Sequence, residues 1–308
     1  MTENERIDLD QLTTEGQNPL SKGLDRLDAL EIVRLINAED AAITDAVALV
    51  ATSIASAIDV ITDRLSQGGR LVYTGAGTSG RLGVLDAVEC PPTFNTSPDQ
   101  VIGLIAGGKD ALFHAVEGAE DSPEQGAEDL RKITLDSRDV VVGIAASGRT
   151  PYVMGALDYA RETGAATIGL SCNPGSELRH HADLNIIPVV GPEVLTGSTR
   201  MKAGTATKMV LNMLTTGAMV RLGKTCGNLM VDVRATNEKL VERSIRIVQA
   251  LTGARRRQAR ESLERCDGEV KLAIIVLQLD VSPEQALIRL QEARGHLGSV
   301  LEAGKTNE

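Results

Sequence analysis

The sequence predicts an α/β fold: a parallel sheet whose faces are covered by helices. Apolar runs alternate with helical patterns through the middle of the chain, which is typical of parallel strands joined by helices. A composition of 42% hydrophobic and 24% charged residues, with 30 glycines, is also ordinary for an α/β protein. The expected strands are residues 70–75, 100–105, 139–145, 166–170 and 185–190.

Helical patterns flank this central region. Before the first strand we expect helices at 28–40 and 44–66, the second ended by Gln67-Gly68-Gly69, and residues 1–23 form a polar extended arm. Ser122-Pro123 has the composition of a helix start. Further helices are expected at 200–222, 234–252, 255–265, 268–280 and 283–293.

The last three of these helices are short and predict a small C-terminal helical domain. We therefore divide the chain into an N-terminal arm with helices (1–54), a ligand-binding α/β domain (55–235), and a linking helix followed by the helical domain (236–308).

Composition excludes several classes of function. A net charge of −10 with 2% aromatic residues and no Trp does not suit a nucleic-acid binder. No apolar segment is long enough to span a membrane and the N-terminus is not a signal peptide, so we expect a cytoplasmic protein. The four cysteines form no CxxC pair and the four histidines no HExxH motif, so we expect neither a metal nor a cofactor.

Small-residue turns follow an apolar run or open a helix at three places. Thr78, Ser79 and Gly80 form the first, Ser147, Gly148 and Thr150 the second, and residues 196–199 the third. A helix N-terminus offers free N–H groups and a positive dipole end to an anion. Hydroxyls stand where a P-loop would carry its lysine, so the pattern favours one phosphate monoester over a nucleoside triphosphate. Each turn by itself is equally compatible with a tight turn that needs glycine.

A dinucleotide site is the weaker interpretation of the first turn. Residues 75–80 match GxGxxG by letter, but residues 93–97 hold no carboxylate to bind a ribose. Acid–base chemistry needs carboxylates, and the candidates are Glu89, just before Cys90-Pro91-Pro92, and Glu117, Glu120 and Asp121. A carboxylate pair divides acid and base roles when its environment separates the two pKa values. On pattern alone, most such residues simply face water.

Together these motifs closely resemble the bacterial N-acetylmuramic acid 6-phosphate etherases, a family that carries a sugar isomerase (SIS) domain. The resemblance covers most of residues 12–235, and the tail resembles the family's C-terminal helical domain. It is carried by residues 12–15, 75–81, 89–92, 116–121, 144–152, 171–175, 191–204 and 227–233.

The resemblance implies cleavage of the lactyl ether of N-acetylmuramate 6-phosphate. By likeness, Glu89 protonates the departing lactate and Glu120 removes the C2 proton, whereas Glu117 does not match the family's catalytic position. From the residues themselves we expect a sugar phosphate to be bound by the hydroxyls of Thr78, Ser79, Ser147 and Thr150, with the backbone amides of Gly80 and Gly148 beside them. Two alternatives stay open: an aldose–ketose isomerase on the same scaffold, and a non-catalytic sugar-phosphate sensor.

Helix geometry raises a question about Glu89. If residues 80–89 are an unbroken helix, Glu89 lies about 14 Å along the axis from the phosphate-binding end, farther than a sugar phosphate reaches. Either the helix bends near Gly83 or Glu89 serves the site of a second subunit. We therefore expect a homodimer with shared active sites.

Overall fold

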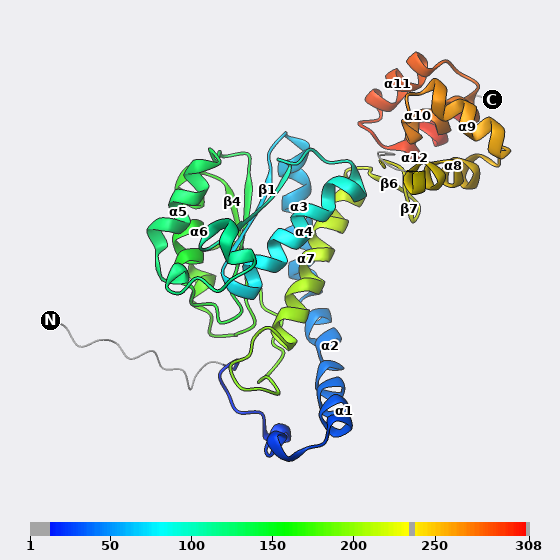
Figure 1. Cartoon of the computed structure of the whole chain (residues 1–308). Helices are drawn as coiled ribbons and strands as arrows, with labels where there is room; N and C mark the ends of the chain where they lie inside the picture. Colours follow the sequence, from blue (N-terminus) through cyan, green and yellow to red (C-terminus); the bar gives the residue numbers. More distant parts are fainter. Residues whose placement is uncertain (1–12, 234–237, 306–308) are drawn as a thin grey trace. The chain divides into compact units, whose positions relative to one another are not determined.

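A five-stranded parallel sheet forms the centre of the α/β region (Figure 1). The computed structural model describes residues 13–233 and 238–305. The strand order is β2-β1-β3-β4-β5, with β1 at Leu71–Gly75, β2 at Val101–Ile105, β3 at Val140–Ile144, β4 at Ala166–Leu170 and β5 at Leu184–Ile186. The predicted fold class is confirmed. Strands β1, β2 and β3 are one or two residues shorter than expected, and β5 ends well before residue 190, because Pro188 has no N–H to donate to a strand ladder.

Helices pack against this sheet or lead into it. Their bounds are α1 Ala29–Asp40, α2 Ile43–Ala48, α3 Ala51–Ser66, α4 Gly77–Phe94, α5 Pro123–Lys132, α6 Pro151–Thr163 and α7 Lys202–Arg221. The helix predicted at 44–66 is interrupted at Leu49 and Val50, and the chain bends there by 59°. Helix α3 buries Ile54, Ala57, Ile61 and Leu65, and α2 buries Ile43, Ala46 and Val47, whereas α1 buries no residue.

Two predicted helix boundaries are confirmed, the end of α3 and the start of α5. Helix α3 ends at Ser66 with Gln67 as its C-cap, and Gly68 follows with a φ of +81°, the left-handed region that glycine adopts at low cost. Helix α5 begins as expected, with the Ser122 side chain accepting a hydrogen bond from the Gln125 N–H and Pro123 in the first turn.

The described part of the N-terminal arm, from Thr13 onward, is not extended as predicted. It folds into turns and two 3₁₀ helices, η2 at Pro19–Ser21 and η3 at Leu24–Arg26. The Asn18 side chain explains this difference, because it caps η2 through the Leu20 N–H (2.9 Å) and donates to Glu39 on α1 (2.6 Å). The hydrogen bonds of Asn18, one local and one to a distant helix, thus order a segment whose polar composition predicts an extended chain.

The C-terminal region contains a short hairpin and a helical bundle. Its elements are β6 Thr225–Cys226, β7 Leu229–Met230, α8 Glu238–Thr252, α9 Arg256–Arg265, α10 Val270–Leu279, α11 Pro283–Glu292 and α12 Leu297–Lys305. The hairpin and α12 were not predicted; α12 carries Gly298 and Gly304, which weaken a helical pattern, although Leu297 and Val300 are buried in the bundle core. The start of the helix predicted at 234–252 lies outside the described residues.

By contacts, the described chain separates into two compact units. The residues up to Val88, together with Asp99–Thr215, form the first unit, and Glu89–Pro98 with the residues from Thr216 onward form the second. The core of the second unit is built by α8 to α12 around α10. The domain boundaries after residues 54 and 235 stay a proposal.

Within the described ranges, no single helix is long and apolar enough to cross a membrane. The bent pair Ala29–Ala48 and Ala51–Ser66 meets the length and composition criteria only when the two are taken together.

Asp86 ties α4 to its neighbours in the first unit. It is buried and accepts hydrogen bonds from Tyr73 on β1 (2.9 Å) and from Asn212 (2.7 Å) and Thr215 (3.3 Å) on α7. One carboxylate therefore joins a central strand and two long helices.

We predict that Asp86→Ala destabilises the protein by about 3 kcal/mol, because it removes the buried carboxylate that accepts from Tyr73, Asn212 and Thr215. Urea denaturation of the purified variant measures this. Asp25→Ala, at an exposed aspartate in η3, is the matched control and should change stability by less than about 0.5 kcal/mol. Equal effects of the two substitutions would contradict the role given to Asp86.

The ion pair between Glu39 and Lys202 generates a pH-dependent prediction. The Lys202 ammonium lies 2.8 Å from the Glu39 carboxylate, and its hydrogen bond holds the pKa of Glu39 below the ordinary value of 4.5. A carboxylate with a lowered folded-state pKa stabilises the fold fully above its unfolded pKa and loses that contribution as the pH falls through the folded value.

We therefore expect the difference in unfolding free energy between the wild type and Glu39→Gln to be constant from pH 7 to about 5 and to shrink below pH 4.5. Urea denaturation across this range measures it. Glu162→Gln, at an exposed glutamate, is the control. A difference that persists unchanged at pH 3 would rule out the pair as its source.

Candidate active site

The first two predicted phosphate-binding turns leave the same edge of the sheet. Strands β1 and β3 are parallel neighbours, and their pairing ends at Gly75 opposite Ile144. The chain continues from Gly75 into α4 and from Ile144 through Ser147 and Gly148 into α6. Ligands of open α/β sheets bind at this carboxyl edge.

The first turn brings the start of α4 against the end of β1. A β-carbon at Gly75 would lie 2.8 Å from the Gly80 nitrogen, and one at Gly80 would lie 2.7 Å from the Gly75 oxygen, so both positions require glycine. The Gly80 N–H, which we expected to bind phosphate, already donates to the Ala76 oxygen (3.1 Å). Helix α4 begins as early as Gly77, so Gly80 already closes a helical turn.

The groups available at this helix start are therefore those before Gly80. The N–H groups of Gly77, Thr78 and Ser79 precede the first intrahelical bond. In the described ranges, the hydroxyls of Thr78 and Ser79 make no hydrogen bond, and both residues are half-buried. The predicted hydroxyl donors stay candidates, whereas the Gly80 amide is replaced by the amides just before it.

The second turn shows the same shift. Gly148 has a φ of +74°, and a β-carbon there would lie 2.1 Å from the Ser176 hydroxyl, so only glycine fits. Its N–H donates to the Ala145 oxygen (2.9 Å) instead of being free for an anion. Thr150 precedes α6 without capping it through its side chain, and the Ser147 hydroxyl accepts from the Arg149 N–H (3.3 Å).

The third turn differs from the prediction. Helix α7 begins at Lys202, and its first N–H groups, those of Lys202 and Ala203, both donate to the Glu193 carboxylate at 2.9 Å. Glu193 is fully buried. A carboxylate from the chain itself thus occupies the positive end of this helix, and residues 196–199 do not supply a third free helix N-terminus.

Glu120 lies in a cavity beside the start of α4. The cavity has a volume of about 200 Å³, and its lining includes Gly77 and Arg81 of α4 together with His114, Glu117 and Glu120. Glu120 belongs to the 3₁₀ turn η5, Ala119–Asp121, in the loop between β2 and α5. The structure thus brings the predicted base next to the predicted phosphate-binding helix, and Glu117 lines the same cavity.

Arg81 connects the two sides of this cavity. Its guanidinium donates from Nε to the Leu112 oxygen and from Nη2 to the His114 oxygen, both at 3.2 Å. The residue follows Gly80 on α4, so its hydrogen bonds hold the loop that carries Glu120 close to the phosphate-binding end.

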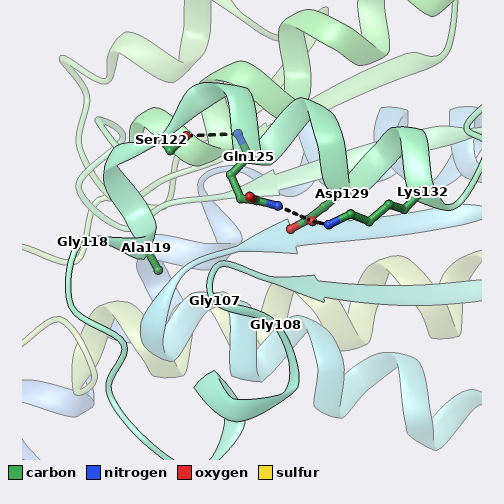
Figure 2. Close-up of a pocket in the computed structure, with 8 residues that line it drawn as sticks. All are labelled: Gly107, Gly108, Gly118, Ala119, Ser122, Gln125, Asp129 and Lys132. Atoms are coloured by element: carbon green, nitrogen blue, oxygen red, sulfur yellow. Dashed lines mark hydrogen bonds and ion pairs between the residues drawn. The ribbon is translucent and has the colours of Figure 1, made fainter.

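A second cavity of about 490 Å³ borders the same loop (Figure 2). Gly118 and Ala119 line both cavities. The polar side chains of the second cavity bond to one another, since Asp129 accepts from Gln125 (2.7 Å) and Lys132 (3.0 Å). Asp129 also accepts from the Tyr152 hydroxyl (2.9 Å), so this carboxylate is committed to structural bonds. We therefore place the site in the smaller cavity.

Glu89 stands apart from this cavity in sequence and in position along α4. Proline is expected to end a helix, but α4 runs from Gly77 to Phe94 with Pro91 and Pro92 inside it. Glu89 is exposed, nine residues after Gly80, and is not among the residues that line the cavity.

Sequence reasoning missed Arg81, Glu193 and Asn173. Arg81 follows the glycine-rich turn directly, which is a usable signal for a residue at a site. Glu193 accepts from N–H groups nine and ten residues later, and Asn173 donates to the Thr14 hydroxyl, 159 residues away in the sequence. No local pattern reveals either contact. Among the described residues, no group of three or more His, Cys, Asp or Glu side chains is arranged to hold a metal ion.

Family models match most of the chain. The model of the glucokinase regulatory protein N-terminal SIS domain matches residues 53–161, and the general SIS domain model matches residues 121–217. The model of the C-terminal lid domain of glucokinase regulatory protein matches residues 227–267.

Curated relatives match over nearly the whole length. The chain is 61% identical over 293 residues to the N-acetylmuramic acid 6-phosphate etherase of Rhodopirellula baltica, covering 95% of this chain and 97% of that protein. It is 57% identical over 298 residues to the protein of the same name from Streptomyces avermitilis (97% and 96% covered), and 53% identical to that from Photorhabdus laumondii (97% and 99%). With this identity along the full chain and an SIS-type sheet, the protein belongs to the N-acetylmuramic acid 6-phosphate etherase family.

Proposed function

We propose that this protein cleaves the D-lactyl ether of N-acetylmuramate 6-phosphate, a carbon–oxygen lyase reaction that yields N-acetylglucosamine 6-phosphate and D-lactate. Family membership at 53–61% identity supports the reaction. The observation in the structure that supports it best is the cavity shared by Glu120 and the free N-terminal turn of α4. We place the reaction in the cytoplasm, in the recycling of cell-wall amino sugars.

The chemistry requires one base and one acid. In the open-chain sugar the ether oxygen lies β to the aldehyde, so removal of the C2 proton gives an enolate that can expel lactate. An acid must protonate the leaving oxygen, because an alkoxide is a poor leaving group. Water then adds to the unsaturated aldehyde, which restores a hydroxyl at the same carbon. Each proton transfer by a positioned side chain contributes about 10²–10⁴-fold.

We assign the C2 proton abstraction to Glu120 and the protonation of lactate to Glu89, which also activates the incoming water. The half-buried hydroxyls of Thr78, Ser79, Ser147 and Thr150 are candidates to bind the phosphate. The N–H groups at the start of α4 support them, since the positive end of a helix favours an anion.

The position of Glu89 on α4 supports a homodimer with shared sites. The helix is unbroken past Gly83, so Glu89 lies about 14 Å along its axis from Gly80. Leu85 and Val88 on the same helix are 50% and 57% exposed, and Met213 on α7 is 41% exposed. Exposed apolar side chains on the helix that carries a catalytic candidate are the kind of surface that a partner covers. We therefore propose that Glu89 acts in the site of the partner subunit.

We predict that substitutions of the two glutamates block different steps of the reaction. Glu120→Gln should lower both D-lactate release and solvent deuterium exchange at C2 by about 10²–10⁴-fold, since no base removes the proton. Glu89→Gln should lower lactate release to a similar extent while exchange at C2 continues. Enzymatic assay of D-lactate and mass spectrometry of the recovered sugar phosphate measure the two steps.

Glu117→Gln is the matched control, because Glu117 lines the same cavity as Glu120. It should keep lactate release within about threefold of the wild type. If Glu117→Gln loses exchange and Glu120→Gln keeps it, the base is Glu117 instead. An active isomerase that releases no lactate would refute the proposed reaction itself.

We predict that a mixed dimer of one Glu89→Gln and one Glu120→Gln subunit has about half of the wild-type activity. One of its two sites is intact if the two glutamates of a site come from different subunits, whereas the other site lacks both glutamates. The subunits are co-expressed with different tags, and the doubly tagged dimer is purified and assayed. An inactive mixed dimer would show that each site uses both glutamates of one chain.

A further inference from the structure

A buried polar cluster joins the N-terminus to the second phosphate-binding turn. Asn173, in the loop after β4, is 1% exposed, and Thr14 is fully buried. The Asn173 side chain accepts from the Thr14 N–H (3.2 Å) and donates to the Thr14 hydroxyl (3.0 Å). It also donates to the main-chain oxygens of Ala146 (3.0 Å) and Ser147 (3.2 Å).

Residues 13–18, which this cluster holds, form an N-terminal strap. Its other end is anchored by Asn18, which donates to Glu39 (2.6 Å) and to the Pro192 oxygen (3.4 Å). Between these anchors the strap lies against the loop before α7, since a β-carbon on Gly197 would lie 3.2 Å from the Glu15 carboxylate. The strap is thus fixed across the loops at the carboxyl edge of the sheet.

The bonds of Asn173 determine which way the second turn presents its polar groups. The Ala146 oxygen accepts from the Asn173 side chain and from the Cys172 N–H (3.0 Å). A planar trans peptide holds its C=O and the following N–H on opposite sides. The Ser147 N–H therefore points away from Asn173, and carbonyl oxygens that would repel a phosphate are turned into the protein.

We propose that Asn173 is a positioning residue for phosphate binding, which couples the N-terminal strap to the Ser147 turn. It directs the Ser147 N–H toward the anion, and it makes the strap part of the binding edge. The residue does not touch the reacting atoms, so its substitution lowers the affinity for the phosphate without removing the acid or the base. This inference rests on the proposed function only for the identity of the sugar.

The test compares Asn173→Asp and Asn173→Ala with the wild type. Asn173→Asp keeps the acceptor for the Thr14 N–H but replaces the donor with oxygen against the Ala146 and Ser147 carbonyls. We expect both variants to raise KM for N-acetylmuramate 6-phosphate and the inhibition constant of inorganic phosphate about tenfold, the effect of losing one hydrogen bond to a charged group. The kcat should change by less than about threefold.

A second pair of variants addresses the strap from its own side. Thr14→Val has nearly the same shape but lacks the hydroxyl, so it should raise KM and the phosphate inhibition constant in the same direction. Thr14→Ser keeps the hydroxyl and should behave like the wild type. Asn185→Ala is the matched control, because the Asn185 side chain on β5 donates to the Arg179 oxygen (3.2 Å), which lies in neither turn.

The outcomes separate this inference from the proposed function. Folded variants of Asn173 and Thr14 with unchanged KM and unchanged phosphate inhibition overturn the positioning role. A fall in kcat alone, with KM unchanged, also overturns it, because that result indicates a general loss of active enzyme. If the wild type releases no lactate, the proposed function fails, and the affinity for inorganic phosphate measured by calorimetry still decides the role of Asn173.

Discussion

The contact between the backbones of Gly75 and Gly80 determines the geometry of the rest of the site. A β-carbon on either residue would come within 2.8 Å of the other's main chain, so the first turn of α4 can lie against the end of β1 only without side chains there. That contact sets where α4 begins and therefore which N–H groups are free. It also fixes Arg81 one position later, where its guanidinium reaches the loop that carries Glu120.

From this contact the site is assembled by groups that lie far apart in the sequence. The β1–α4 turn and the β3–α6 turn become neighbours because β1 and β3 pair in parallel. Arg81 donates hydrogen bonds to the loop that follows β2, and Asn173 donates to Thr14 of the N-terminal strap. Arg81 and Asn173 also donate to main-chain carbonyls near the site, Arg81 to two in the β2–α5 loop and Asn173 to two in the second turn, which keeps those oxygens away from a bound anion.

The sequence predicted much of this arrangement because the informative signals are local. Strand runs such as residues 139–145 and helix starts such as Ser122-Pro123 are decided by a few adjacent residues, and the structure confirms them. The prediction of an extended arm was wrong from residue 13 onward, because Asn18 donates hydrogen bonds to Glu39 and to the Pro192 oxygen only in the folded chain. The prediction that the amides of Gly80 and Gly148 are free was also wrong. Which N–H is bonded depends on the exact residues at which a turn or a helix begins, and the glycine pattern does not specify those residues.

The cap that Glu193 places on α7 has a consequence for how the protein responds to its ligand. This helix carries its counter-anion within the chain, so the order of its first turn is independent of the solute. The starts of α4 and α6 have no such internal acid among the described residues, and water or an anion from solution must satisfy them. Saturating phosphate should accordingly shield amides around Gly77 and Ser147 from hydrogen exchange while those at Lys202 and Ala203 exchange at an unaltered rate.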